Sequence, residues 1–420
     1  MANDMGWTPI PSDRANATVE TVDTAPGRSE QVRRKTPWPA IKTLAWVFVL
    51  SRIFFIEVAS LAYIYLPHAW VEAPQGTLPP PGDMLYRSLI GLWVHWDGLW
   101  YLSIATFGYQ GRPTATAFFP LYPLTMRLLG AGVVSGMLVS VVAFAGALWF
   151  FYQLVRIDLG ERTAWYAILG LAFFPTAFYA NAVYSESLFL VLATSSLYFG
   201  RIRRYWLAGP LAALATLVTM YGILLAAPLA WLIWRQEGFR LRVLAQVLWV
   251  PAGVAAYMAY LMPLFGDPLV FERAQSNWGR HFLPPYQTLW QAARFSWRYA
   301  AQATNLQTLF ALGPPSSAIS NFWNFLFALV AIALLLAAAR RIPFYLVLYA
   351  GLALLVPLSY PAQGNPLMSM PRLVLEAFPV FAGLGALMAR WRTVRYVYFA
   401  LAIPTGILFV ALFATAHWVA

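Results

Sequence analysis

Residues 133–155 read VVSGMLVSVVAFAGALWFFYQLV and carry no charged side chain. A helix needs about 20 apolar residues to cross the ~30 Å hydrocarbon core of a bilayer. Because water is absent there, every backbone N–H and C=O must be bonded within the protein, and this stretch lacks the alternating pattern of a membrane barrel strand. It therefore predicts a membrane-spanning α-helix, which is followed by Arg156.

The composition of the whole chain favours the same environment. Of its 420 residues, 60% are hydrophobic and only 10% are charged, and the mean hydropathy is +0.62. A soluble domain carries about 25% charged residues. We therefore predict an all-α, polytopic transmembrane helix bundle of about eleven spans, with helical outside loops. The expected spans are 40–66, 133–155, 164–180, 184–200, a broken pair within 206–234, 243–265, 321–339, 343–357, 373–389 and 396–418.

Basic residues occur in short clusters between the apolar stretches. A net charge of +12 would by itself suit nucleic-acid binding, but clusters of this kind mark cytoplasmic loops, so no nucleic-acid partner is expected. This rule places the outside loops at about 67–132, 266–320 and 359–372. The clusters are Arg33, Arg34 and Lys35; Arg201, Arg203 and Arg204; Arg235, Arg240 and Arg242; Arg340 and Arg341; and Arg390, Arg392 and Arg395.

The first 36 residues are polar and contain no apolar core of signal-peptide type. We interpret 1–36 as a disordered cytoplasmic tail and 37–420 as one transmembrane domain. Within it, the apolar stretch 206–234 has basic clusters on both sides. One straight helix would place the second cluster outside, whereas two short helices broken near 219–222, or a re-entrant pair, keep both inside. Whether this stretch crosses once or twice stays open.

Several kinds of chemistry are excluded or disfavoured. The chain has no cysteine, which rules out disulfides, thiol catalysis and cysteine-ligated metals. It has no P-loop, DxD pair or dinucleotide fingerprint, which disfavours a soluble nucleotide-sugar donor. Carboxylates outside the tail concentrate in the predicted outside loops, which indicates a site at that face. Among them are Asp83, Asp97, Asp267 and Glu272.

The stretch His95-Trp96-Asp97-Gly98-Leu99-Trp100-Tyr101 places one acid among aromatic residues just after the first span. Partial desolvation there would raise the proton affinity of Asp97, as a general base requires. Trp and Tyr also suit the headgroup level and offer apolar faces to sugars or lipid chains. An interfacial aromatic belt in which Asp97 caps a helix or pairs with an arginine remains the alternative.

Five blocks together resemble the PIG-V family, the second mannosyltransferase of glycosylphosphatidylinositol assembly, and its bacterial relatives, which are membrane glycosyltransferases of the GT-C class. The blocks occur in the family's order, and the resemblance covers most of the chain from Val47 onwards. They are HWDGLWYLSIATFGYQG (95–111), AFFPLYPL (117–124), FFPTAFYANAVYSESLFL (173–190), GDPLVFERAQSNWGR (266–280) and SMPRLVLEAFPVF (369–381).

This resemblance implies a GT-C fold and a polyprenyl-phosphate sugar donor, with mannose as the expected sugar. Asp97 would be the catalytic residue that deprotonates or orients the acceptor hydroxyl of a lipid or glycan, while the sugar leaves the phosphate with inversion. No cofactor is required, although a divalent cation is possible, and no metal ligands are assigned. The substrate-binding candidates are His95, Trp96, Trp100, Tyr101, Tyr184, Glu186, Arg280 and Arg372, with Arg112 and Arg273 behind the last two.

Each candidate has a structural alternative. Glu186 could cap a helix, Arg280 and Arg372 could pair with nearby acids, and His95 could be a plain surface residue. Met220 departs from the family, whose members often have an arginine there. A flippase or transporter of lipid-linked sugars, or a non-catalytic subunit of a glycan-assembly complex, therefore stays open. We expect a multi-pass protein of a bacterial plasma membrane, surrounded by membrane lipids, with its site outside.

Overall fold

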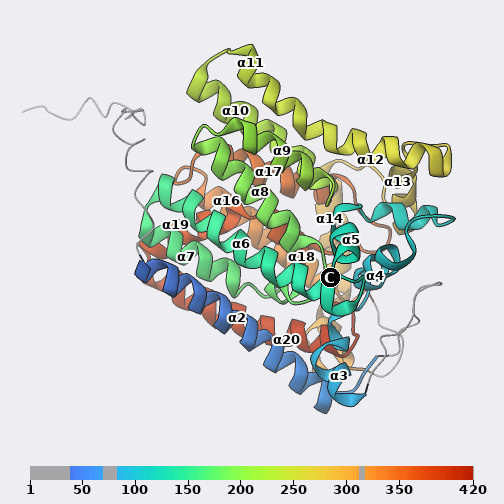
Figure 1. Cartoon of the computed structure of the whole chain (residues 1–420). Helices are drawn as coiled ribbons and strands as arrows, with labels where there is room; N and C mark the ends of the chain where they lie inside the picture. The colour runs from blue at the N-terminus through green and yellow to red at the C-terminus, as the bar shows by residue number, and fades with distance from the viewer. Residues whose placement is uncertain (1–37, 70–82, 312–316, 420) are drawn as a thin grey trace, which may run out of the picture. The chain divides into compact units, whose positions relative to one another are not determined.

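The computed structural model describes residues 38–69, 83–311 and 317–419, and it is all-helical over these residues (Figure 1). The only β pairing in this part of the chain is an isolated bridge between Ala362 and Asn365. The predicted tail, 1–36, lies outside the described residues. The all-α class predicted from hydropathy is therefore confirmed for the described part.

Five helical stretches are long and apolar enough to cross a membrane. A sixth exists if two helices, bent by 84° at their junction, count as one span. The predicted eleven spans are thus not confirmed by helix length and composition. The five stretches are α2 (Trp38–Tyr65), α6 (Val133–Leu159), α11 to α12 (Leu241–Leu244, η5 Ala245–Leu248, Trp249–Phe265), α16 (Asn321–Ala338) and α20 (Arg392–Ala414), and the bent pair is α18 (Met370–Glu376) with α19 (Pro379–Arg390).

Other predicted spans form shorter helices. A helix of 12 residues is about 18 Å long and cannot cross the hydrocarbon core alone. The helix expected over 164–180 ends at Ala172. Pro175 cannot continue a helix and restricts the backbone of the residue before it. A coil and the short helix η3 (Ala177–Ala180) follow. These shorter helices are α7 (Glu161–Ala172), α8 (Glu186–Arg201), α9 (Tyr205–Thr216), α10 (Ala226–Glu237) and α17 (Phe344–Ser359).

The stretch 206–234 is broken where the sequence predicted a break. The short helix η4 (Met220–Leu225) separates α9 from α10. A Cβ on Gly222 would lie 2.3 Å from the Thr216 backbone nitrogen, so only glycine permits this close approach of the two backbones. The stretch is therefore two half-length helices rather than one straight span.

The predicted outside loops are helical in their described parts, as expected. The first contains α3 (Met84–Leu89), η1 (Gly91–Trp93), α4 (Asp97–Phe107), η2 (Pro113–Ala117) and α5 (Leu121–Leu128). The second contains α13 (Val270–Ala274), η6 (Gln275–Trp278), α14 (Pro285–Ala303) and α15 (Leu306–Leu309).

Helices far apart in sequence pack side by side. The first long helix, α2, lies along the last, α20, at the lower edge of Figure 1, and α6 packs between its neighbours α7 and α8. Helix α19 approaches α7 closely at Gly385. A Cβ on this residue would lie 2.7 Å from the Thr163 carbonyl oxygen, so a larger side chain would not fit. Small residues at helix contacts are typical of membrane bundles, where close packing replaces the hydrophobic effect between helices.

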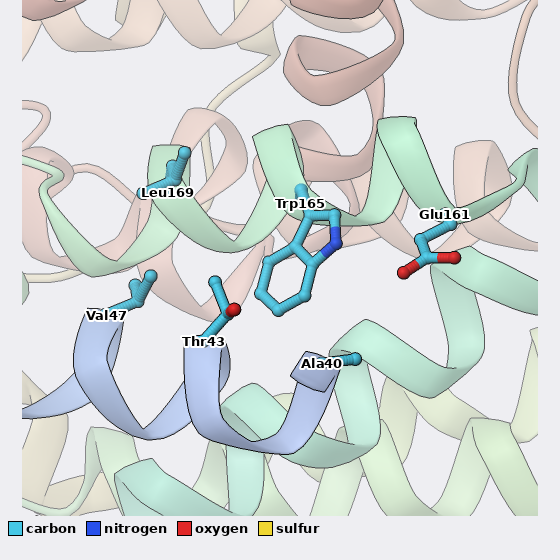
Figure 2. A pocket seen from close by; sticks show the side chains of 6 residues that line it. All are labelled: Ala40, Thr43, Val47, Glu161, Trp165 and Leu169. Carbon is cyan, nitrogen blue, oxygen red and sulfur yellow. The ribbon is translucent and has the colours of Figure 1, made fainter. Parts of the chain in front are cut away.

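A cavity of about 290 Å³ lies between the N-terminal parts of α2 and α7. Figure 2 shows the Trp165 indole between the two helices, with the Glu161 carboxylate to one side and Thr43 facing it from α2. Tyr152 donates a hydrogen bond to Glu161 at 3.3 Å. None of the sequence-predicted site residues lines this cavity.

Candidate active site

Asp97 is the first residue of α4, and the backbone before it has an unusual conformation. Trp96 has φ 52°, and such a value costs a non-glycine residue of order 1–3 kcal/mol unless the surroundings impose it. The coil before α8 provides these surroundings. The Val183 N–H donates to the Trp93 carbonyl at 3.0 Å, and a Cβ on Gly98 would lie 3.1 Å from the Val183 carbonyl oxygen. This contact fixes Asp97 beside the start of α8.

Arg372 is presented in a similar way, in the first turn of α18. Ser369 precedes that helix with φ 69°, in the left-handed region. The Thr176 hydroxyl donates to the Pro371 carbonyl at 2.8 Å and so ties the start of α18 to the break between α7 and α8. Arg372 is therefore held by residues on both sides of its helix start.

Asn365 anchors the loop that leads into α18. Its side-chain amide donates to the Ser317 carbonyl and the Ser320 hydroxyl, both at 2.9 Å, and its oxygen accepts from Asn324 at 2.9 Å. All of its amide groups are satisfied while the side chain is buried. Asn365 thus fastens the loop to the start of α16 and to the turn before it.

The Arg372 guanidinium joins two carboxylates from different parts of the chain. Its Nη1 contacts Asp97 Oδ2, and its Nε lies 3.2 Å from Glu186 Oε1. The side chains of Arg372 and Asp97 are 16% and 28% exposed, whereas that of Glu186 is only 7% exposed. Asp97 is thus the member that a substrate can reach most easily. We call these three residues the Arg372 cluster.

Aromatic rings cover the cluster. The Arg372 guanidinium carbon lies 5.4 Å from the ring centre of Tyr184 and 5.9 Å from that of Tyr179, within the range of cation–π attraction. The Tyr101 hydroxyl lies 2.8 Å from Ser185 Oγ. Burial raises the pKa of the Tyr101 phenol well above its ordinary value, and the charges of Glu186 and Asp97 raise it further. Tyr101 therefore stays neutral at physiological pH.

Arg280 approaches the same region from the second outside loop. Its Nη1 donates to the Tyr360 carbonyl at 3.3 Å, and among the described residues no carboxylate forms an ion pair with it. Burial is the main cause that lowers the pKa of Arg280, and the nearby positive charge of Arg372 adds to this effect. An arginine still keeps its charge at neutral pH. Arg280 therefore supplies a positive charge close to the Arg372 cluster.

Comparisons with known proteins show what the chain is similar to. Residues 48–236, which contain Asp97 and Glu186, match the family described as Mannosyltransferase (PIG-V). Over this segment the chain resembles the PIG-V mannosyltransferases. GPI mannosyltransferase 2 of Drosophila melanogaster is 34% identical over 122 residues, which are 26% of this chain and 27% of that protein. GPI alpha-1,6-mannosyltransferase 2 of Homo sapiens is 30% identical over 205 residues, 44% of this chain and 41% of that protein.

The chain thus aligns with less than half the length of these PIG-V relatives. Among solved structures, the oligosaccharyltransferase of Archaeoglobus fulgidus, in complex with zinc and sulfate, matches with 12% identity and a TM-score of 0.38. That match covers 86% of this chain and 53% of the oligosaccharyltransferase.

Three of the predicted binding residues pack against other aromatic rings. Trp96 meets Trp418 edge to face at 4.8 Å, and Trp100 stacks on Phe118 at 5.6 Å. His95 packs on an aromatic ring of α20, and burial lowers the pKa of its imidazole to about 4. His95 is therefore uncharged at neutral pH and does not offer a phosphate a positive charge. Its carbonyl accepts a hydrogen bond from the Tyr184 hydroxyl at 3.1 Å.

The structural alternatives hold for several other charged residues. Arg273 pairs with Asp267 at 3.2 Å, and Arg112 donates to Ser103 and to the Gly108 carbonyl. Arg52 is buried in α2 and donates to the Ala177 carbonyl at 2.8 Å and to Asn181 at 3.2 Å, so it braces the break after α7.

Glu376 and Tyr179 were not among the predicted site residues, although both lie near the Arg372 cluster. Tyr179 faces the Arg372 guanidinium, and Glu376 follows Arg372 by one turn of α18, is 5% exposed and lies within electrostatic range of Arg372 and Glu186. The i, i+4 spacing of Arg372 and Glu376 places them on one helix face. That spacing was the signal available in the sequence.

No group of three or more His, Asp or Glu side chains is arranged to hold a metal ion within 38–69, 83–311 and 317–419. Asp97 and Glu186 both face a guanidinium instead. The Arg372 cluster offers one cation, two carboxylates and aromatic faces. This combination suits an anionic, sugar-bearing ligand.

Proposed function

We propose that the chain is a membrane glycosyltransferase that transfers a sugar, with mannose as the expected one, from a polyprenyl-phosphate donor to a lipid or glycan acceptor. The observation that carries the proposal is the Arg372 cluster, in which a basic group that can bind phosphate touches a carboxylate that can accept a proton. The PIG-V match over 48–236 supports the same reaction class.

The two arginines are assigned to the leaving phosphate. Phosphate groups need cations or directed N–H donors, and arginine offers both in a planar fork. Arg372 is already charged and oriented, and Arg280 has no carboxylate ion pair among the described residues, so a phosphate would bind Arg280 directly and share Arg372 with its carboxylates. Arg280 is within electrostatic range of Tyr221, the neighbour of Met220. It therefore provides a cation close to the position where family members often have arginine.

The base lies next to the phosphate-binding group. Asp97 Oδ2 contacts Nη1 of Arg372, the guanidinium assigned to the donor phosphate. The acceptor hydroxyl then attacks the anomeric carbon, its proton passes to Asp97, and the bond from that carbon to the phosphate oxygen breaks. The product has inverted configuration, and polyprenyl phosphate leaves.

The proposal includes the location of the reaction. The Arg372 cluster would lie at the extracytoplasmic face of a multi-pass protein with GT-C architecture, a location that the positions of the basic clusters support. The short helices would pair to complete about eleven membrane segments. A bacterial plasma membrane suits this arrangement, because lipid-linked donors reach that face whereas nucleotide sugars are cytosolic. Aromatic rings and surrounding membrane lipids hold the polyprenyl chain. A divalent cation is not needed for these steps.

The test uses the purified full chain in lipid nanodiscs, with polyprenyl-phosphate mannose and a lipid extract as acceptor. Asp97→Asn should lower the transfer rate by about 10²- to 10⁴-fold, the contribution typical of a general base, while expression and melting temperature stay close to wild type. Asp83→Asn is the matched control, because Asp83 lies in the same outside loop and only caps α3. Mass spectrometry distinguishes transfer from transport, because a flippase leaves the donor mass unchanged. Full activity of Asp97→Asn would remove Asp97 from the base role.

A further inference from the structure

Three interruptions of helical structure meet in one part of the bundle. They are the coil and η3 between α7 and α8, the stretch around η4 between α9 and α10, and the bend between α18 and α19. Both η4 and α18 contact α8 and α17. Irregular backbone at membrane depth is tolerated only where protein buries it or where it lines a polar cavity. Discontinuous helices in membrane proteins often border a binding site for this reason.

Buried polar atoms without partners lie beside these breaks. Oε2 of Glu186, Oε2 of Glu376 and the hydroxyl of Tyr349 have no hydrogen-bond partner. The two glutamates are 5% exposed and Tyr349 is fully buried. Glu376 lies within electrostatic range of Glu186, and Tyr349 within range of Glu376 and Tyr221. Most buried polar groups in proteins are hydrogen-bonded, so three neighbouring exceptions call for a physical reason.

The charges around Arg372 indicate which kind of ligand the unpaired polar atoms can bind. Arg372 is already shared between Asp97 and Glu186, so Glu376 adds a further carboxyl group to a region whose nearest cation is engaged. A ligand that suits this region donates hydrogen bonds to carboxylate oxygens and carries no negative charge there. Sugar hydroxyls have this chemistry. Glu376 follows Arg372 by about 6 Å along the α18 axis, a separation that suits a hexose ring attached to a phosphate on the arginine.

We propose that Glu376, Tyr349 and the free oxygen of Glu186 form a subsite for the hydroxyl groups of the donor sugar. The inference rests on the proposed function, since it assigns the phosphate to Arg372 and the sugar to the groups beyond it. The two carboxyl groups accept hydrogen bonds from the sugar, and the Tyr349 hydroxyl donates one or accepts one. The subsite would select between sugars by which of their hydroxyls reach these three groups.

Two tyrosines on α17 make a matched experiment. Tyr345 and Tyr349 are both buried and lie one turn apart. The Tyr345 hydroxyl donates to Asp158 at 2.6 Å, whereas the Tyr349 hydroxyl has no partner. Tyr349→Phe should raise KM for polyprenyl-phosphate mannose about tenfold, the effect of one lost hydrogen bond, and leave the melting temperature unchanged. Tyr345→Phe should lower the melting temperature and leave KM unchanged.

Glu376→Gln keeps the shape of the side chain and replaces its carboxyl group with an amide. It should lower kcat/KM about tenfold, because a hydrogen bond to the sugar is lost or weakened. Its melting temperature should equal or exceed that of the wild type, because the variant no longer buries an ionisable carboxyl group whose Oε2 lacks a partner. Loss of activity together with gain of stability is expected for a ligand-binding group and not for one that only supports the fold.

Deoxy-mannosyl polyprenyl phosphates identify the contact. If Glu376 or Tyr349 binds a particular hydroxyl, the variant and the wild type should react equally fast with the donor that lacks this hydroxyl, while they differ with every other donor. An equal loss with all donors, or no loss with any, would overturn the subsite. Absence of transfer by the wild-type protein is a separate outcome, seen before any variant is compared. It would overturn the proposed function itself.

Discussion

Two buried arginine–carboxylate clusters occur in the bundle, and they differ in how completely their polar atoms are paired. In the first, which we call the Arg201 cluster, Asp158 Oδ1 lies 2.6 Å from Arg201 Nε, and Oδ2 accepts from the Tyr345 hydroxyl at 2.6 Å. Both carboxylate oxygens are therefore used, and the cluster links α6, α8 and α17. In the Arg372 cluster, Glu186 keeps one oxygen without a partner.

The difference separates a structural cluster from a functional one. A fully paired cluster stabilises the helix contacts and offers nothing to a ligand, whereas an incompletely paired one loses stability and keeps groups ready for a substrate. The two clusters occur in the same bundle, and each contains an arginine paired with an aspartate. Each therefore serves as the control for the other.

The largest expected effect is that of Arg372→Gln. The change leaves Asp97 and Glu186 without their cation, and loss of one partner from a buried pair costs about 3–5 kcal/mol in the free energy of unfolding. Transfer should fall below detection, because the donor phosphate also loses its main contact. The free energy of unfolding in detergent and the transfer rate measure the two effects.

Arg201→Gln is the comparison for that variant. Arg201 is 33% exposed, and water can replace part of its interaction with Asp158, so the loss should be about 1 kcal/mol, with transfer close to wild type. Equal losses of transfer in the two variants would show that the clusters do not differ in function.

Acid should destabilise the protein through His95, two residues before Asp97. Burial lowers the pKa of the folded-state imidazole to about 4, and the nearby charge of His68 lowers it as well, whereas an unfolded histidine titrates near 6.5. The neutral ring is favoured by folding, so this stabilisation is complete above about pH 6.5 and disappears as the pH falls towards 4. The loss should approach about 3 kcal/mol.

His95→Gln should remove most of this pH dependence, because glutamine does not titrate. Free energies of unfolding between pH 4 and 7 for the two proteins provide the measurement. Parallel curves would contradict the assignment to His95. The Arg201 cluster contains no histidine, so its variants should keep the wild-type slope.

Asp158→Asn should affect stability and not catalysis. The amide keeps the shape of the side chain, but it lacks the charge that pairs with Arg201. It also weakens the hydrogen bond that the side chain accepts from the Tyr345 hydroxyl. We expect a loss of about 2 kcal/mol. KM and kcat for transfer should remain within twofold of wild type, in contrast to Asp97→Asn. A large change in kcat would indicate that the two clusters are linked across the bundle.

Much of the helix order was predictable from the sequence, because hydropathy and proline act locally. The long apolar runs gave α2, α6, α16 and α20, and the break near Gly222 was predicted from the basic clusters around it. The lengths of the shorter helices were not predicted. Besides Pro175, the end of α7 depends on Arg52, more than a hundred residues earlier, which donates to the carbonyls of Ala172 and Ala177.

The site was predicted residue by residue but not as an arrangement. Asp97, Glu186 and Arg372 were each singled out, although the first and the last are 275 positions apart, and no local pattern states that they touch. The bend after Glu376 and the missing partner of Tyr349 depend on packing between distant helices. Whether Asp97 acts as the base stays a prediction.

The smallest expected effect concerns the backbone before Arg372. Near the Arg201 cluster, the residue with positive φ is Arg203, which lies just after the end of α8. Residues in the left-handed region are common at this position of a helix. Ser369 instead precedes α18 with φ 69°, and its side chain makes no capping hydrogen bond. Ser369→Gly should therefore raise the free energy of unfolding by about 1 kcal/mol and leave transfer within twofold of wild type.

Gly364→Ala is the reciprocal change in the same loop. Gly364 has φ 76°, and an added Cβ would meet no atom within 4 Å, so alanine should cost about 1 kcal/mol through backbone strain alone. Thermal unfolding of both variants in one detergent compares them directly. If Ser369→Gly instead raised KM for the donor, the left-handed conformation of Ser369 would be needed to orient the Arg372 side chain. The functional part of the Arg372 cluster would then include the backbone of Ser369.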